Sequence, residues 1–200
     1  MTTPRTLLSL AGAPTHPAPL DRAALVIVDA QAEYLPTGRL PLAGIDAAVE
    51  ETARLLELAR RRGLPVFHVV HHGAPGGPVF DPQGPGSAII PAVAPREGEP
   101  VVSKGLPNSF AGTDLHARLA ATGRKELIVA GFMTHICISA TVRAATDLGY
   151  RNTLVAGATA TRDLPGASGG VVPAAELQRN ELAALSDFFA VVVPDVGAWR

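Results

Sequence analysis

The chain has few cysteines, lysines and aromatic residues. Among its 200 residues there is one cysteine, Cys137, and there are two lysines, Lys104 and Lys125. A single cysteine cannot form an internal disulfide, which is typical of a reducing compartment and favours a cytoplasmic protein. Because almost every other cationic side chain is an arginine, each lysine is a candidate for a specific role.

Long hydrophobic runs and clusters of basic residues are also absent. The formal net charge is −1, so neither nucleic acid nor an anionic membrane is an expected partner. No apolar run approaches the ~18 residues of a membrane span. A short apolar run at residues 7–11 is followed by Pro14, Pro17 and Pro19, which predicts an extended N-terminal arm over residues 1–20 instead of a signal peptide.

Residues 21–200 are expected to form one domain, since 47% of the chain is hydrophobic and this length supports one sizeable core. Apolar, β-branched runs alternate with segments of helical periodicity. The predicted strands are 25–28, 66–70, 101–103, 127–130, 153–156 and 190–193, and the predicted helices are 45–62, 114–122, 136–148 and 174–188. This alternation indicates an α/β fold with three layers, α/β/α, around a mostly parallel sheet of roughly six strands.

Three chemically active side chains follow predicted strands. Asp29 ends the first strand, Lys104 ends the third, and Cys137 lies just past the fourth, where a helix begins. Parallel sheets bind ligands beyond the carboxyl ends of their strands, so an acid, an amine and a thiol are expected at one edge of the sheet. A thiol near a helix N-terminus is also expected to have a lowered pKa.

These residues could perform nucleophilic catalysis. Asp29 could accept the thiol proton, and Lys104 could favour the thiolate and stabilise developing negative charge. Structural roles are open for each of them: Cys137 as a small buried hydrophobe, Asp29 as the cap of a turn, and Lys104 as a surface amine.

Three segments containing these residues resemble the signature segments of the isochorismatase-like cysteine hydrolases. They are residues 28–31 (Val-Asp-Ala-Gln), residues 104–115 (Lys-Gly-Leu-Pro-Asn-Ser-Phe-Ala-Gly-Thr-Asp-Leu) and residues 131–137 (Gly-Phe-Met-Thr-His-Ile-Cys). The resemblance implies that Cys137 is the nucleophile of a triad with Asp29 and Lys104, without a cofactor, in a hydrolase of small amides or other C–N substrates that proceeds through a thioester.

The resemblance also implies a cis peptide bond between Phe132 and Met133, and an oxyanion hole formed by the amides of Met133 and Cys137. It implies a homo-oligomer, a dimer or tetramer. The candidate substrate-binding residues are Gln31, His71, Phe110, Thr113 and Thr134. Isochorismatases of this fold cleave a vinyl ether and have another residue at the nucleophile position, so Cys137 disfavours that activity.

Nicotinamidases of the same superfamily hold a metal with an Asp-x-His segment, which this chain lacks. It has His68, His71 and His72 instead. Adjacent histidines on an extended chain point to opposite sides and cannot easily share an ion, so no metal site is expected and a nicotinamidase is disfavoured.

Three further features stay open. The Pro- and Gly-rich segment 73–98 is long for a loop and could reach over the site or towards another subunit, with Phe80 in contact. Trp199 could dock on this chain or a second one. Arg162 could pair with Asp163 or with an acidic substrate, and the pair with Asp163 is favoured.

Two other functions compete with cysteine hydrolysis. One is metal-assisted hydrolysis through the histidine cluster. The other is a binding protein on the same fold, in which the triad is vestigial. The identity of the substrate is beyond what these patterns determine.

Overall fold

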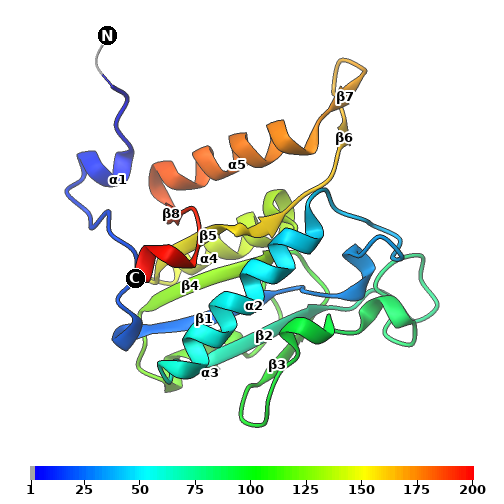
Figure 1. Cartoon of the computed structure of the whole chain (residues 1–200), viewed down its shortest axis with the longest axis horizontal. Helices are drawn as coiled ribbons and strands as arrows, with labels where there is room; N and C mark the ends of the chain where they lie inside the picture. The colour runs from blue at the N-terminus through cyan, green and yellow to red at the C-terminus, as the bar shows by residue number, and fades with distance from the viewer. Residues whose placement is uncertain (1–2) are drawn as a thin grey trace.

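The computed structural model describes residues 3–200, and at its centre is a six-stranded sheet with helices on both faces (Figure 1). The strand order is β3-β2-β1-β4-β5-β8, and every neighbouring pair is parallel. The strands are β1 (Ala23–Val28), β2 (Val66–His71), β3 (Val101–Lys104), β4 (Glu126–Phe132), β5 (Arg151–Ala160) and β8 (Val191–Val193). The predicted α/β fold is therefore confirmed.

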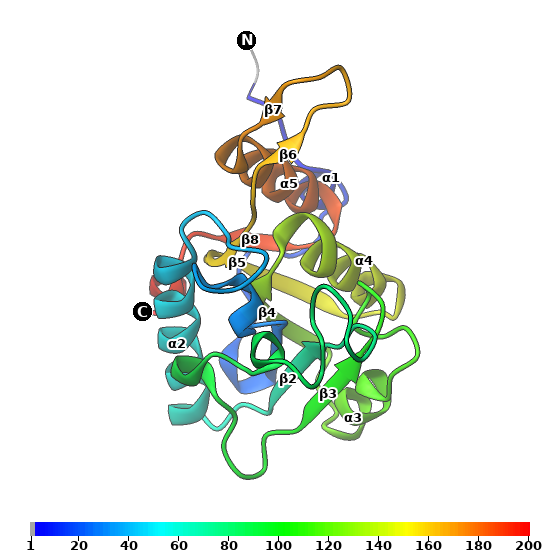
Figure 2. The ribbon, with the colours of Figure 1, turned by 90° about the vertical axis from the view of Figure 1, so that its right-hand side faces the viewer.

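Helices cover the two faces of the sheet (Figure 2). The α-helices of the described residues are α1 (Leu7–Leu10), which lies against α5, and α2 (Ile45–Arg61), α3 (Leu115–Ala121), α4 (Ser139–Asp147) and α5 (Ala174–Phe188). Helix α2 packs on one face, where Leu55 and Leu56 join a core with Leu25 and Ile27 of β1. Helices α3, α4 and α5 contribute to the core on the opposite face.

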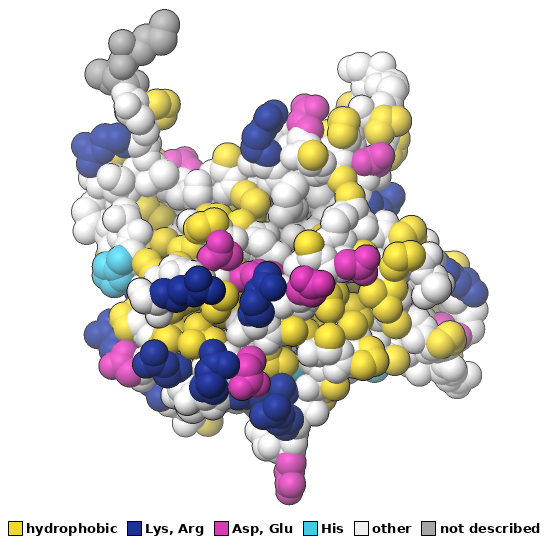
Figure 3. Space-filling model, viewed as in Figure 1, with side chains coloured by type: hydrophobic (Ala, Val, Ile, Leu, Met, Phe, Trp, Pro, Cys, Tyr) yellow, Lys and Arg dark blue, Asp and Glu magenta, His cyan; other side chains and the backbone are white. Residues whose placement is uncertain are grey.

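The outer face of α2 is charged, because its apolar residues recur at helical spacing on the opposite face, which packs on the sheet. Arg54 lies 3.9 Å from Glu50, and Arg61 lies 3.5 Å from Glu57. Figure 3 shows these alternating basic and acidic side chains gathered over α2. Exposed pairs of this kind contribute little to stability, so burial of the apolar stripe is what holds α2 on the sheet.

The central strands β1 and β4 are buried along their whole length, as expected for parallel strands covered on both sides. At their carboxyl ends, Val28 pairs with Val69 of β2 and with Gly131 of β4. The strand order reverses direction between β1 and β4, and such a switch point is where open α/β sheets bind ligands.

The N-terminal segment differs from the extended arm that was predicted. Residues 7–10 form α1, because the Thr6 hydroxyl caps the Ser9 N–H and Leu7 N–H donates to Asp187 Oδ1 of α5 at 2.8 Å. Farther along, Trp199 docks on its own chain by donating Nε1–H to Ala18 O. Met1 and Thr2 of the predicted arm lie outside the described residues. No helix in residues 3–200 is long and apolar enough to cross a membrane.

Some short elements were not predicted. They are the antiparallel hairpin β6 (Leu164–Pro165) and β7 (Val171–Val172), a π-helical turn (Thr134–Ile138), and 3-10 turns at Leu20–Arg22, Ala32–Tyr34, Pro85–Ser87, Pro91–Val93 and Val196–Trp199. Elements of two to five residues are too short to show a periodicity in the sequence.

Gly131 of β4 lies directly against the end of β1, where it pairs with Val28. Its φ is +117°, and a methyl group there would overlap the Val28 carbonyl oxygen. We expect Gly131→Ala to lower the free energy of unfolding by about 3 kcal/mol, through backbone strain and overpacking. Urea denaturation measures this change.

Gly123→Ala is the matched control, since Gly123 also has a positive φ, +70°, but open space around it. Its expected cost is only about 1 kcal/mol. Equal losses in the two variants would contradict the close-approach argument.

Candidate active site

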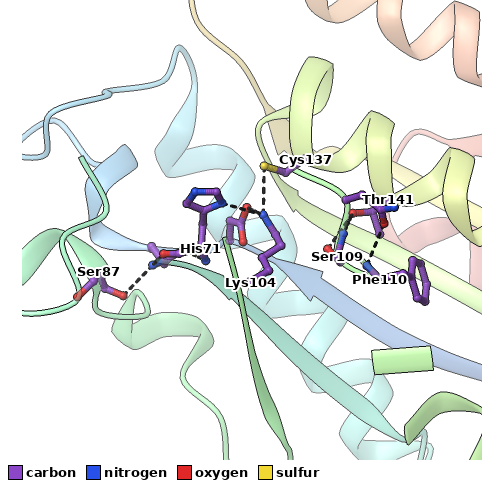
Figure 4. A network of polar contacts seen from close by, with 10 residues as sticks. His71, Ser87, Lys104, Ser109, Phe110, Cys137 and Thr141 are labelled. Carbon is purple, nitrogen blue, oxygen red and sulfur yellow. Dashed lines mark hydrogen bonds and ion pairs between the residues drawn. The ribbon is translucent and has the colours of Figure 1, made fainter. Parts of the chain in front are cut away.

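Asp29, Lys104 and Cys137 meet at the carboxyl edge of the sheet, as predicted (Figure 4). Lys104 Nζ donates to Asp29 Oδ2 at 2.7 Å and lies 3.3 Å from Cys137 Sγ. All three side chains are buried. The second carboxylate oxygen, Asp29 Oδ1, is buried and has no hydrogen-bond partner among the described residues, so it is available to a proton from the thiol or from a substrate.

Asp29 is held by a tight turn at the end of β1. Its φ is +51°, in the left-handed region that few non-glycine residues adopt. The Asp29 N–H donates to Val69 O, and its carbonyl oxygen accepts from Gln31 N–H, both at 2.8 Å. Strained backbone of this kind concentrates at functional sites.

Cys137 is presented by the segment after β4. The Phe132–Met133 peptide bond is cis, and residues 134–138 follow as a π-helical turn in which Ile138 N–H donates to Met133 O. The Met133 N–H makes no hydrogen bond to another group within residues 3–200. The Met133 amide, four residues before Cys137, is therefore free to donate a hydrogen bond.

The electrostatics of the site keep the thiol protonated in the free protein. Burial raises the pKa of Asp29 to about 6, although Lys104 opposes the rise. Burial, followed by the charge of Asp29, raises the pKa of Cys137 to about 12. The lowered pKa expected from the helix-end position is wrong, because loss of solvent and a neighbouring carboxylate outweigh the favourable effect of Lys104.

His71 is the additional side chain that reaches this group. Its Nδ1 lies 3.2 Å from Lys104 Nζ, and its ring contacts Phe80 with centroids 4.9 Å apart. Burial and the Lys104 charge lower the pKa of His71 to about 4. The ring is therefore neutral near pH 7 and can accept a hydrogen bond from the lysine.

The Lys104 ammonium occupies the place where a metal would have to sit. One ligand atom each of Asp29, His71 and Cys137 lies within 4.8 Å of the others, a spacing that suits a small cation. Yet Nζ contacts all three residues. His68 and His72 do not join this group: they contact Glu99 and Ser103, respectively.

Gln31 was expected to orient substrate, and the structure gives it a different role. Its Nε2 donates to His71 O at 3.0 Å and to Ser87 O at 2.9 Å, and its Oε1 accepts from His71 N–H. The side chain is fully buried. Gln31 therefore fastens the end of β2 to the 73–98 segment and has no amide hydrogen left for substrate.

Phe110, Thr113 and Thr134, the other side chains that were predicted to bind substrate, make contacts within the chain. Phe110 stacks on Tyr150 with centroids 6.1 Å apart, and its ring points away from Cys137 (Figure 4). The Thr113 hydroxyl donates to Ser109 O, and the buried Thr134 hydroxyl donates to Ala160 O at 3.0 Å. Each residue lies in a segment that carries the triad, but its side chain braces that segment.

The 73–98 segment packs on the site of its own chain. Ala32 N–H donates to Ala88 O, and Ile90 N–H donates to Ala30 O. Phe80 is buried against Tyr34 at a centroid distance of 5.4 Å. The sequence pattern does not single out Tyr34, because it lies in an irregular turn, where periodicity carries no information about which way a side chain points.

Known proteins resemble this chain over most of its length. The Isochorismatase domain family matches residues 23–194. A crystal structure of an isochorismatase from Pseudomonas putida KT2440 is 50% identical, with a TM-score of 0.91, and the match covers 96% of this chain and 97% of that one.

Two curated relatives differ in what their names describe. A secreted isochorismatase effector of Verticillium dahliae is 36% identical, over 92% of this chain and 94% of its own length. A maleamate amidohydrolase of Pseudomonas putida is 36% identical, over 66% of this chain and 69% of its own length. With this coverage and the buried Asp-Lys-Cys cluster at the switch point of a parallel sheet, the chain belongs to the isochorismatase family of hydrolases.

Proposed function

We propose that this protein is a cysteine-dependent hydrolase that cleaves a small-molecule amide, or a related C–N bond, through a thioester on Cys137. The observation that carries the proposal is the position of Lys104 Nζ, in contact with both Asp29 Oδ2 and Cys137 Sγ. The free Asp29 Oδ1 completes a path for one proton.

The first half-reaction forms the acyl-enzyme. Cys137 Sγ attacks the carbonyl carbon while its proton moves to Asp29, so that no free thiolate accumulates. The carbonyl oxygen becomes an oxyanion, which the amides of Met133 and Cys137 stabilise. As the C–N bond breaks, Asp29 returns the proton to the leaving nitrogen, and ammonia or an amine departs.

The second half-reaction releases the acid. Asp29 removes a proton from a water molecule, which attacks the thioester carbonyl, and the C–S bond breaks. The thiol recovers its proton from Asp29. One water is consumed, so the balance is amide plus water to carboxylic acid plus ammonia.

Names of relatives support an amide substrate over an ether. Besides maleamate amidohydrolase, they include ureidoacrylate amidohydrolases and a streptothricin hydrolase. Ether cleavage on this fold does not require a cysteine nucleophile, and the buried contacts of Cys137 have no purpose in it. A vestigial triad is disfavoured, since a buried ammonium and carboxylate are costly to maintain.

Cys137 is the first residue to test. We expect Cys137→Ala to lower ammonia release from a panel of small amides by at least about 10⁴-fold, as loss of a covalent nucleophile does. Acid-quenched wild-type protein should carry an acyl group at Cys137, detected by mass spectrometry. Because the chain has no other cysteine, the modified thiol is unambiguous.

Cys137→Ser serves as the matched control for folding, and its circular dichroism should equal that of the wild type. Full activity in Cys137→Ala would contradict covalent catalysis. Hydrolysis of a vinyl ether by that same variant would favour the ether reaction instead.

The pH dependence should report Asp29. Because its carboxylate must be ionised to accept the thiol proton and its pKa is raised to about 6, kcat/KM should fall as the pH drops below about 6. Because Asp29, Lys104 and Cys137 interact, the midpoint of this fall is an apparent pKa of the three residues together. The kcat/KM profile is measured from pH 4.5 to 8. An activity that is flat over this range in a protein that stays folded would exclude Asp29 as the base.

Alkylation of Cys137 by iodoacetamide tests the electrostatics without any substrate. Asp29 raises the pKa of the thiol and Lys104 lowers it. We expect Asp29→Asn to react roughly tenfold faster than wild type at pH 8, and Lys104→Gln to react more slowly. Changes of the same sign in both variants would show that access to the thiol, and not charge, controls its reactivity.

A further inference from the structure

Ser109 and Thr141 form a buried hydrogen-bonded pair between two segments of the catalytic site. The Ser109 N–H donates to Thr141 Oγ1 at 3.1 Å, and the two hydroxyl oxygens lie 2.8 Å apart. Both side chains are withdrawn from water, since Ser109 is 0% and Thr141 1% exposed. Ser109 belongs to the segment that begins with Lys104, and Thr141 belongs to α4, which follows Cys137. The pair therefore joins the segment of the lysine to the helix of the thiol (Figure 4).

The sheet does not make this connection. Lys104 ends β3 and Cys137 follows β4, and the strands β2 and β1 lie between them. Because neighbouring strands are about 4.8 Å apart, β3 and β4 are separated by roughly 14 Å. Apart from the contact between Lys104 and Cys137, the hydrogen bonds that join residues 104–115 to residues 134–147 all run between Ser109 and Thr141.

Cys137 and Thr141 meet the lysine segment from the same side of their helix. They are four residues apart, a spacing that places two side chains one above the other on a helix. Cys137 Sγ lies 3.3 Å from Lys104 Nζ, and Thr141 contacts Ser109. Residues 105–107, which connect the lysine to the serine, are exposed. The Ser109–Thr141 pair is thus the buried polar anchor nearest to the reacting thiol on this segment.

The turn around Ser109 is braced by its own hydrogen bonds. The Thr113 hydroxyl donates to Ser109 O at 2.6 Å, and the Phe110 N–H donates to Asn108 Oδ1 at 2.9 Å. A turn that is braced from within moves as one unit. Its attachment to Thr141 therefore determines how closely the whole lysine segment approaches α4.

We propose that Thr141 is a positioning residue of the hydrolase: through Ser109 it holds the lysine segment against α4, and so keeps Lys104 Nζ in contact with Cys137 Sγ. The catalytic meaning of this inference rests on the proposed function, to which it adds a residue that touches neither substrate nor the reacting atoms. A misplacement of about 1 Å among reacting groups can lower a rate about 100-fold. The contact is also visible without substrate, because Lys104 lowers the pKa of Cys137.

The first test measures alkylation of Cys137 by iodoacetamide and needs no turnover. Thr141→Val removes the hydroxyl and keeps the branched shape of the side chain. We expect it to slow alkylation at pH 8 about tenfold, as a rise of one unit in the pKa of the thiol does. Thr141→Ser keeps the hydroxyl and should restore the wild-type rate. An unchanged rate in a folded Thr141→Val would overturn the assignment.

Ser109→Ala is the milder variant, and it decides the question if Thr141→Val does not fold. It removes the Ser109 hydroxyl but leaves the Ser109 N–H to donate to Thr141. We expect alkylation to slow in the same direction and by a smaller factor. A rate equal to or above that of the wild type would contradict the proposal.

Thr146→Val is the matched control for a loss of stability. Thr146 lies on the same helix, and its hydroxyl is hydrogen-bonded to Val142 O and to Asn152 Nδ2, both at 3.1 Å, so its partners lie outside the lysine segment. The variant should be less stable in urea and keep the wild-type alkylation rate. Equal slowing in Thr146→Val and Thr141→Val would show that general loosening of α4 is the cause.

A double-mutant cycle determines whether Thr141 acts through Lys104. In the Lys104→Gln background, Thr141→Val should have no further effect on alkylation, because the contact that it maintains is already lost. Slowing by the same factor with and without Lys104 would show that the two residues act independently, and the positioning role would be wrong.

Steady-state kinetics with a cleaved amide separate this inference from the proposed function. Thr141→Val should lower kcat about 10- to 100-fold with KM nearly unchanged, and Thr141→Ser should recover most of kcat. A change confined to KM would contradict the positioning role and leave amide hydrolysis intact. If the wild type forms no acyl-enzyme with any amide, the proposed function fails, and the alkylation cycle still decides whether Thr141 positions Lys104.

Discussion

The site depends on a buried ion pair between Lys104 and Asp29. Each charge alone would be strongly disfavoured in this interior, and removing one partner of such a pair typically costs about 3–5 kcal/mol. Further contacts stabilise the buried pair, because Lys104 Nζ also contacts His71 and Cys137. Three acceptor atoms therefore surround one ammonium. These contacts of the lysine fix the direction of each neighbour.

The sheet supplies the geometry that this pair requires. Lys104 ends β3, His71 ends β2, and Asp29 follows β1, so that three adjacent parallel strands deliver their side chains to one edge. Cys137 arrives from the far side of the switch point, after β4. The Gln31 side chain then ties β2 to the 73–98 segment through three hydrogen bonds. The irregular loop thus becomes part of the wall of the site.

The same burial determines the chemistry. It raises the pKa values of both Asp29 and Cys137, so the resting thiol is a weak nucleophile until a carbonyl lies beside it. In the proposed mechanism, proton transfer to Asp29 and attack on the carbonyl are coupled, so the site discriminates substrates by which carbonyl it places next to the thiol.

Sequence alone determined the order of strands and helices, because buried parallel strands and amphipathic helices leave distinct periodicities. It also predicted that Asp29, Lys104 and Cys137 lie at one edge of the sheet, since the carboxyl ends of parallel strands share that edge. Only the tertiary structure decided the direction of each side chain and its solvation. Gln31, Phe110, Thr113 and Thr134 lie in the predicted segments, and the structure shows that their side chains contact other parts of the chain. The pKa of Cys137 was predicted with the wrong sign for the same reason: burial and the distance to a carboxylate arise from packing, and no local pattern encodes them.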